Sequence, residues 1–247
     1  MKIAVIISQV PDTTTKIEIA SDAKSIDESN IEWILNPYAE FAVEKALLLK
    51  EAHDAIEEVI ILALGPDRTV SAIRSALAMG ADQGILLKTD VLDAQALADK
   101  IKELGIDLVL GAKKNIDIEA AWLEAGVAAH LDLPVIANAN KLSFEADKLI
   151  VEREASGAKE KFELSLPALV TCDKGQDEPR YASVMGLMKA KKKPLEEIDI
   201  SATDTIGIEA VKAELPKPRE AVKIFEGSPE EAAKQLVDAL KNEAKVL

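Results

Sequence analysis

The sequence has little of the side-chain chemistry that most catalytic and metal sites use. It contains one cysteine, Cys172, and two histidines, His53 and His130. A single cysteine cannot form an internal disulfide, and no cluster of ligands with metal-site spacing occurs. Gly-x-Ser-x-Gly, Walker A and His-Glu-x-x-His motifs are also absent. We therefore expect neither catalytic residues nor a metal, and we interpret Cys172 as a buried structural thiol.

Long hydrophobic runs and an excess of positive charge are absent as well. No stretch of 18 uncharged apolar residues occurs, which predicts no membrane insertion. The 44 acidic residues outnumber the 30 basic ones, with a formal net charge of -14, which argues against nucleic-acid binding. The first apolar run is more typical of a strand than of a signal peptide. We expect a soluble protein of a reducing compartment, either the cytoplasm or, in a eukaryote, the mitochondrial matrix.

Apolar runs typical of buried strands alternate with helical patterns over the first two thirds of the chain. The predicted strands are 2–8, 57–65, 84–88 and 107–112, and the predicted helices are 36–54, 68–80, 93–104 and 119–130. Asn36 is a candidate N-cap before Pro37, and Asp67 is a candidate N-cap for the second helix. Four repeats of strand and helix predict an α/β fold with a doubly wound, mainly parallel sheet.

The pattern changes after Leu131. Period-two stretches broken by EAD and SGAK predict antiparallel hairpin strands that join the sheet. From Pro194 the regular core pattern is lost, and a proline-containing extended arm leads to a helix with a capping box at Ser228 and Glu231. The predicted organisation is a Rossmann-like domain over 1–193, followed by an arm and terminal helix over 194–247 that dock on a partner.

The carboxyl ends of the predicted parallel strands are where a ligand is expected in such a sheet. These ends are SQVPD (8–12), LGPD (64–67) and GAKKNIDIE (111–119), and none carries Gly-x-Gly-x-x-Gly. The standard dinucleotide fingerprint is therefore missing, while a mononucleotide held by backbone groups remains open. Asn36 has two interpretations on spacing, as a helix cap and as a ligand contact.

An apolar segment runs directly into a lysine cluster at DEPRYASVMGLMKAKKKP (177–194). Its apolar members stand where a surface loop is expected to be polar; they are Tyr181, Val184, Met185, Leu187 and Met188. One interpretation is an exposed binding surface, since methionines suit adaptable interfaces. The other is a helix with Leu187 and Met188 in the core.

Four segments in the same order resemble the β subunits of electron transfer flavoproteins. They are PRYASVMGLMKAKKKPLEEI, LNPYAEFAVEKAL, LGPD with IRSALAMGAD, and VERE with LPALVT. The resemblance implies a non-catalytic β subunit that pairs with an α subunit, which holds most of the FAD. It also implies a buried AMP, and a recognition loop near 180–193 that docks on an acyl-CoA or similar dehydrogenase. Electrons would then pass to a quinone oxidoreductase or another acceptor.

The resemblance also assigns roles to individual positions. Val184 matches the loop's anchor residue, usually leucine, and the lost methylene is worth on the order of 0.8 kcal/mol if buried. Glu154, beside Arg153, matches a glutamate that tethers the flavin domain, and Tyr38 matches an aromatic near the flavin ring. The implied AMP site comprises Ile6, Asn36, Leu64, Asn115, Asp117, Glu119, Ala121, Trp122 and Leu123.

The chain departs from the family pattern within GAKKNIDIEAAWLEAG. Many members carry Asp-x-Asn-Gln-Thr-Gly there, and its amides and hydroxyl hold the AMP phosphate. This chain has Ala121, Trp122 and Leu123 instead, and the carboxylates of Asp117 and Glu119 do not attract phosphate. AMP, a second FAD or no nucleotide all stay open as occupants. The alternatives to the main interpretation are a bifurcating subunit with two FADs and a stand-alone adenine-nucleotide-binding module.

Overall fold

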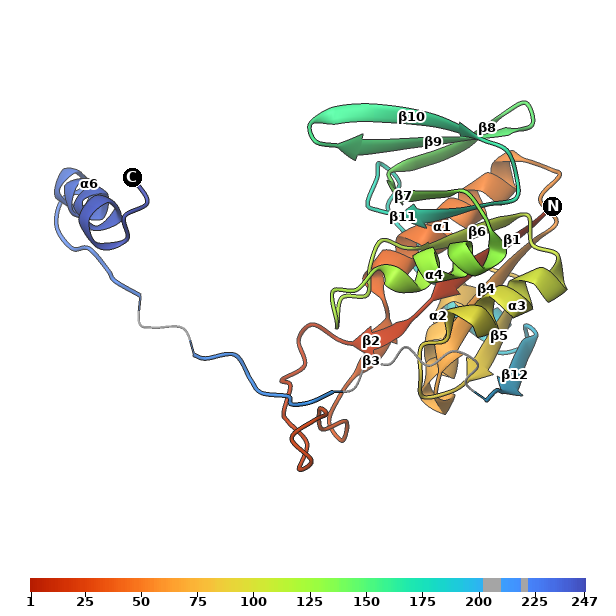
Figure 1. Ribbon diagram of the computed structural model, residues 1–247, viewed down its shortest axis with the longest axis horizontal. Helices are drawn as coiled ribbons and strands as arrows, with labels where there is room; N and C mark the ends of the chain where they lie inside the picture. The colour runs from red at the N-terminus through yellow and green to blue at the C-terminus, as the bar shows by residue number, and fades with distance from the viewer. Residues whose placement is uncertain (202–209, 219–221) are drawn as a thin grey trace.

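A seven-stranded sheet forms the centre of the computed structural model, which describes residues 1–201, 210–218 and 222–247 (Figure 1). The strand order is β12-β5-β4-β1-β6-β11-β7, and each neighbouring pair is parallel. The strands are β1 (Lys2–Ile7), β4 (Glu58–Gly65), β5 (Gln83–Lys88), β6 (Leu108–Ala112), β7 (Val135–Ala139), β11 (Ala168–Cys172) and β12 (Leu195–Asp199). The predicted doubly wound parallel sheet is confirmed.

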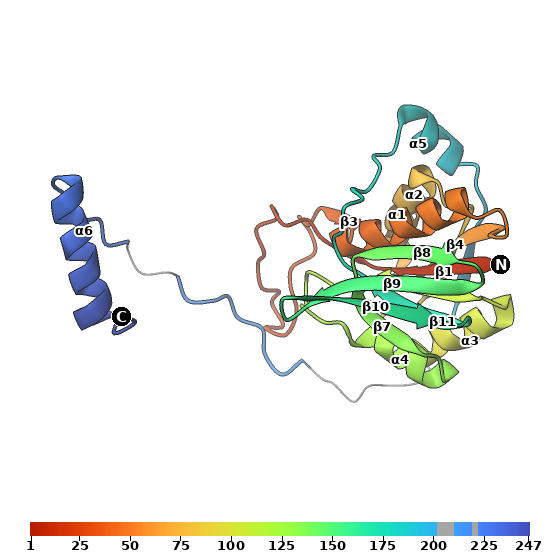
Figure 2. The same cartoon turned by 90° about the horizontal axis from the view of Figure 1, so that it is seen from above.

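Helices cover both faces of this sheet (Figure 2). Helices α1 (Pro37–Ala52) and α2 (Val70–Met79) lie on one face, and α3 (Ala94–Leu104) and α4 (Trp122–Leu131) lie on the other. Successive side chains of a strand point to opposite faces, so Ile3 and Val5 pack in the core with α1 and α2, while Ala4 and Ile6 pack in the core with α3 and α4. Burial on both faces explains why the strand sequences are almost continuously apolar.

Of three predicted helix starts, one is correct and two are wrong. Asn36 is the N-cap of α1, with Pro37 at the first helical position. Asp67 does not cap α2; it starts a short 3-10 turn over Asp67–Thr69, and its carboxylate pairs with Lys88 Nζ at 3.0 Å. Helix α4 begins at Trp122 instead of 119, because Glu119 takes a positive φ of 52° that a right-handed helix cannot continue.

The predicted hairpin strands are present, but they form a sheet of their own instead of extending the central one. Strands β8 (Lys141–Glu145), β9 (Lys148–Ala155) and β10 (Ala158–Leu164) pair antiparallel in the order β10-β9-β8. Leu149 and Val151 of β9 enter the core beside α1. A further small antiparallel sheet joins β2 (Gln9–Pro11) to β3 (Trp33–Leu35).

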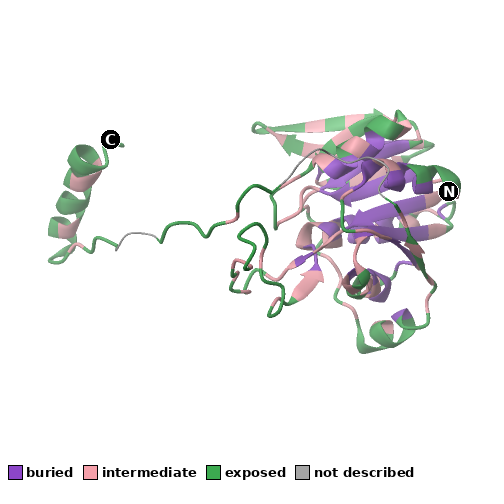
Figure 3. Cartoon of the chain, turned by 60° about the horizontal axis from the view of Figure 1, so that its bottom comes forward, coloured by how far each residue is buried: buried purple, intermediate pink, exposed green. Residues whose placement is uncertain are grey.

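The last part of the chain leaves the sheet later than predicted. Strand β12 lies beyond the boundary placed after residue 193 and pairs with β5 at the edge of the sheet. The arm then leads to α6 (Pro229–Asp238), which starts with the predicted capping box at Ser228 and Glu231 and continues into a π-helical turn, Ala239–Glu243. Figure 3 shows the described residues 210–218 and 222–247 coloured as exposed or intermediate, and none of them as buried. Residues 202–209 and 219–221 of the predicted arm lie outside the described residues.

Among the described helices, none is long and apolar enough to cross a membrane. Within the same residues, no three His, Cys, Asp or Glu side chains gather in a way that could hold a metal ion.

Candidate functional site

A cleft of about 460 Å³ lies at the carboxyl ends of β1, β4 and β5, where a ligand was expected. Three of the predicted residues line it, namely Leu64 at the end of β4 and Asn115 and Asp117 in the loop after β6. A space of this size falls within the range typical of small-molecule sites.

Asn36 helps to build the loop that lines this cleft, and it also caps α1. Its Oδ1 accepts a hydrogen bond from the backbone N–H of Tyr38 at 3.3 Å. Its Nδ2 donates to Lys114 O at 2.9 Å and to Asn115 Oδ1 at 3.1 Å. The Ser8 hydroxyl donates to the same Asn115 oxygen at 2.6 Å. Asn36 is fully buried, so it joins the start of α1 to the cleft loop from behind.

The other predicted nucleotide-site residues lie outside the cleft lining. Ile6 and Leu123 are core residues, and Trp122 packs against the α3 and α4 core. Ala121 is the N-cap of α4, without a side-chain hydrogen bond. Glu119 is exposed and pairs with Lys114. Tyr38 is half-buried, with Lys113 Nζ and Lys114 Nζ 5.8 and 5.6 Å from its ring centroid.

Two polar residues of the cleft were not predicted individually. Gln9 Nε2 donates to Arg68 O at 2.9 Å, and the Arg68 guanidinium stacks 3.9 Å from the centroid of the Trp33 ring. Arg68 Nη2 also donates to Glu28 at 3.2 Å. Within the described residues, Gln9 Oε1 and Arg68 Nε are buried without a hydrogen-bond partner. Gln9 lies within the segment 8–12 that was expected to meet a ligand, and Arg68 comes directly after the segment 64–67.

The first turn of α4, expected to hold a phosphate, is occupied by the chain's own carboxylate. Glu124 is only 6% exposed and lies against Gly111 of β6, where an added Cβ would stand 2.4 Å from Glu124 Cγ. Burial raises the pKa of Glu124 to about 7, although hydrogen bonds from its own N–H and that of Ala112 lower it. A buried carboxylate at this helix start repels an anion. The cleft lining itself carries Asp90 and Asp117, and its Arg68 is paired with Glu28, so the charge of these residues does not fit the phosphate of AMP.

The lysine-flanked apolar segment is a short helix whose apolar side chains are exposed. Helix α5 (Val184–Ala190) is capped by Ser183 Oγ, which accepts from the Gly186 N–H at 3.0 Å. Tyr181 is 99% exposed and Val184 is 77% exposed, and Met185, Leu187 and Met188 are exposed as well. The segment is therefore helical, as one interpretation held, but Leu187 and Met188 are not in the core.

Arg180 fixes the entrance to this helix on α1. Its Nε and Nη2 each donate to the buried Glu44 carboxylate at 2.8 Å, and its Nη1 donates to Glu51 at 2.6 Å. The Arg180 backbone N–H donates to Glu44 as well, at 3.0 Å. These carboxylates raise the pKa of Arg180, and Arg180 lowers the pKa of Glu51. Such a forked contact holds the segment in one place.

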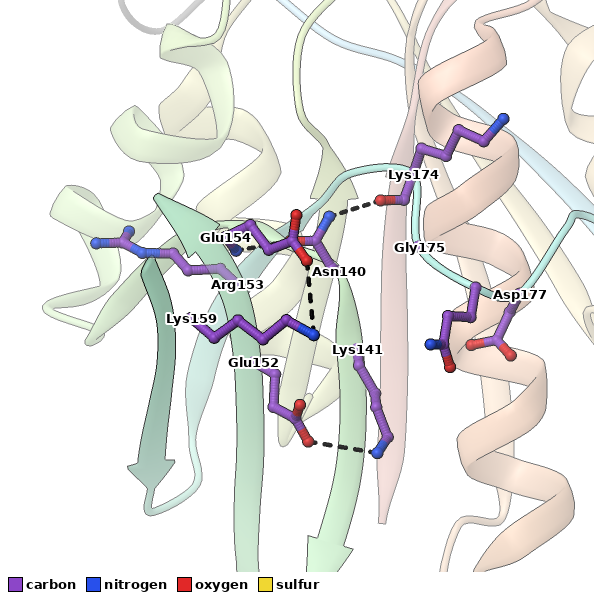
Figure 4. A pocket seen from close by; sticks show the side chains of 10 residues that line it. Asn140, Lys141, Glu152, Arg153, Glu154, Lys159, Lys174, Gly175 and Asp177 are labelled. Atoms are coloured by element: carbon purple, nitrogen blue, oxygen red, sulfur yellow. Dashed lines mark hydrogen bonds and ion pairs between the residues drawn. The ribbon is translucent and has the colours of Figure 1, made fainter. Parts of the chain in front are cut away.

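Arg153 and Glu154 line a second cavity, of about 370 Å³, between the hairpin sheet and the loop after β11 (Figure 4). The Glu154 N–H donates to Asn140 Oδ1 at 2.8 Å, while Asn140 Nδ2 donates to Lys174 O at 2.6 Å. The Glu154 carboxylate is exposed, with Lys159 Nζ 3.9 Å away. Its backbone is thus fixed while its charge faces solvent, which suits contact with another chain.

Cys172 lies at the end of β11 and is fully buried. Burial raises the pKa of its thiol to about 12, so the thiolate does not form near neutral pH. The interpretation as a structural thiol is confirmed.

Comparison with known proteins agrees with the sequence resemblance. Residues 24–203 match the Electron transfer flavoprotein domain family. The chain is 37% identical to the electron transfer flavoprotein subunit beta of Bacillus subtilis (strain 168) over 261 aligned residues, which cover all of both chains. It is 36% identical to the subunit of the same name from Homo sapiens over 233 residues, covering 90% of this chain and 91% of the human one. It is also 36% identical to the electron transfer flavoprotein subunit beta of Syntrophomonas wolfei over 251 residues, which cover 100% of this chain and 98% of the relative.

Proposed function

The chain belongs to the electron transfer flavoprotein family, and we propose that it acts as the β subunit of a heterodimeric electron carrier, not as an enzyme. The observation that carries this proposal is α5, a helix that presents exposed Val184, Met185, Leu187 and Met188 on an otherwise acidic protein. An exposed apolar patch of this kind is typical of a protein–protein contact.

The donor partner is an acyl-CoA or similar dehydrogenase, which receives α5 in a hydrophobic pocket. Val184 stands at the start of the helix and is the most exposed apolar residue within it. The exposed lysines that follow, Lys189, Lys191 and Lys192, suit an acidic rim around such a pocket. The acceptor for the electrons is a quinone oxidoreductase.

FAD supplies the redox chemistry and is held mainly by the α subunit, while this chain supplies docking surfaces and charge. The cavity at Arg153 and Glu154 is the surface against which the flavin domain rests. The exposed Glu154 carboxylate, on a backbone fixed by Asn140, is placed to pair with a cation of that domain. Tyr38, with two ammonium groups beside its ring, faces the same partner.

The arm and α6 dock on the α subunit. All of α6 is described, and none of its residues is buried. Leu236 and Val237 on this helix are 46% and 53% exposed, although they share an apolar face. An amphipathic helix without a packing partner is not stable at this length, so a second chain is expected to cover it.

The cleft at the ends of β1, β4 and β5 does not bind AMP through the first turn of α4. The Glu124 carboxyl group accepts a hydrogen bond from its own N–H in the first turn of α4, and the cleft lining carries Asp90 and Asp117. The heterodimer is therefore expected to contain one FAD and no AMP.

The test is co-expression with an α-subunit gene, followed by acid release and chromatographic quantitation of bound nucleotides. One FAD and no AMP per heterodimer is the expected result. One FAD with one AMP would overturn the exclusion of phosphate, and two FADs would indicate a bifurcating subunit. A chain that forms no heterodimer and carries no flavin would contradict the electron-transfer proposal and favour the stand-alone nucleotide-binding module.

A further inference from the structure

Helix α5 is too short and too exposed to be stable by itself. It has seven residues, all described, and Ala190 is the one that is buried. An isolated helix of this length does not form in water, because the free energy needed to order its first turn exceeds the stabilisation from its few hydrogen bonds. Its apolar side chains point to solvent, so contacts other than hydrophobic burial hold it in place.

The middle of α5 rests on the backbone of α2. Figure 2 shows α5 lying outside α2, on the side away from the central sheet. A Cβ added at Gly186 would stand 2.7 Å from Ala78 O, which is closer than real Cβ atoms approach an oxygen. Glycine therefore permits a close contact between the two helices that a larger residue would prevent.

The carboxyl ends of the two helices are cross-linked by two cationic side chains. Arg74 of α2 donates from Nη1 to Ala190 O at 2.6 Å and to Lys193 O at 2.9 Å. In return, Lys193 Nζ donates to three carbonyl oxygens at the end of α2, those of Leu77, Gly80 and Ala81, at 3.0, 3.1 and 2.5 Å. Carbonyl groups at a helix end lack partners in the helix, and cations there are favourable.

Lys193 differs in this respect from the rest of the lysine cluster. Lys189, Lys191 and Lys192 are exposed, whereas Lys193 is half-buried and turned towards α2. Burial lowers the pKa of Lys193, and the three carbonyl oxygens compensate part of the lost hydration. One lysine of the cluster therefore serves the position of α5, and its neighbours remain free for a partner's surface.

We propose that Arg74 and Lys193 are positioning residues that hold α5 ready for its dehydrogenase partner. This rests on the proposed function of α5 as the docking helix. With both cross-links in place, the exposed side chains of α5 project from a fixed backbone, and the partner does not have to order the segment on binding. Both side chains are half-buried between α5 and α2, so we expect electron transfer within the bound complex not to depend on them.

The experiment compares Arg74→Met and Lys193→Met with the control Lys102→Met in the purified heterodimer. Lys102→Met removes the same charge from an exposed position of α3, on the face of the sheet opposite α2 and α5. We expect both test variants to raise the KM of the dehydrogenase for the heterodimer about fivefold or more, with kcat and flavin content unchanged. The control is expected to change KM less than twofold. Equal effects of all three variants, or no effect of the test variants, would overturn the proposal.

Hydrogen exchange of the free heterodimer gives a second, independent measurement. The backbone amides of α5 are expected to exchange faster in both test variants, while those of β1 and β4 keep their protection. Unchanged exchange in α5 would refute the positioning role even if KM rises. If the wild-type heterodimer accepts no electrons from any dehydrogenase, the proposed function fails, but the exchange result still decides whether Arg74 and Lys193 fix α5.

Discussion

Glu124 provides a test of how burial controls the charge of a carboxyl group at the start of α4. Its side chain is buried between α4 and β6, and burial raises its pKa from the ordinary value of 4.5 to about 7. The N–H groups of Glu124 and Ala112 lower the pKa, but by less than burial raises it. The carboxyl group is therefore more easily kept neutral in the folded protein than in the unfolded chain.

The size of the effect follows from the difference between the two pKa values. The difference between a pKa of 4.5 and one of about 7 corresponds to about 3 kcal/mol, at about 1.4 kcal/mol for each tenfold change in proton affinity. The folded state binds the Glu124 proton more tightly than the unfolded chain does. The stability that the protonated carboxyl group contributes is therefore complete below pH 4.5 and is lost as the pH rises through 7. Glutamine at this position stays neutral, so Glu124→Gln should stabilise the fold by about 1 kcal/mol at pH 5.5 and about 3 kcal/mol at pH 8.

The assay is urea unfolding of wild type and Glu124→Gln across this pH range, followed by circular dichroism. Glu163→Gln, at an exposed position of β10, is the control and should show no pH-dependent difference. The reasoning would be refuted if the free energy of unfolding of Glu124→Gln differed from that of wild type by the same amount at both pH values. It would also be refuted if the variant were less stable than wild type at pH 8. In either case the carboxylate would have to be well solvated or compensated by a partner.

Three further predictions concern docking, anchoring and assembly. Val184→Glu should abolish electron transfer from the dehydrogenase in steady-state turnover while flavin content stays unchanged, because the side chain is 77% exposed in the free protein; unchanged turnover would remove α5 from the docking surface. Arg180→Met should lower the free energy of unfolding by about 2 kcal/mol, since it leaves the buried Glu44 unpaired while Arg180 itself is 34% exposed; a melting temperature equal to wild type would contradict this. Deletion of 222–247 should prevent co-purification of the α subunit on affinity resin, whereas an intact complex would show that the terminal helix is dispensable.

The sequence alone was sufficient where structure depends on neighbours along the chain. The N-cap at Asn36 and the capping box at Ser228 and Glu231 were predicted correctly, because a side chain and the amides it caps lie within three residues of each other. The parallel strands were predicted because burial on both faces demands continuous apolar runs. The same local motifs, in order along the chain, also identified the family.

Tertiary structure decided everything that depends on residues distant in the sequence. The hairpin strands form a separate sheet, and the acidic strand Leu195–Asp199 joins the main one, since pairing partners are chosen by the packing of the whole core. Whether Leu187 is buried or exposed could not be read from its helix, because α2 approaches through Gly186 and leaves Leu187 outside. Glu124 became a buried acid only because Gly111, 13 positions earlier in the printed sequence, leaves room for it. Composition specifies which groups are present, but their pKa values, exposure and partners depend on contacts that only the folded chain creates.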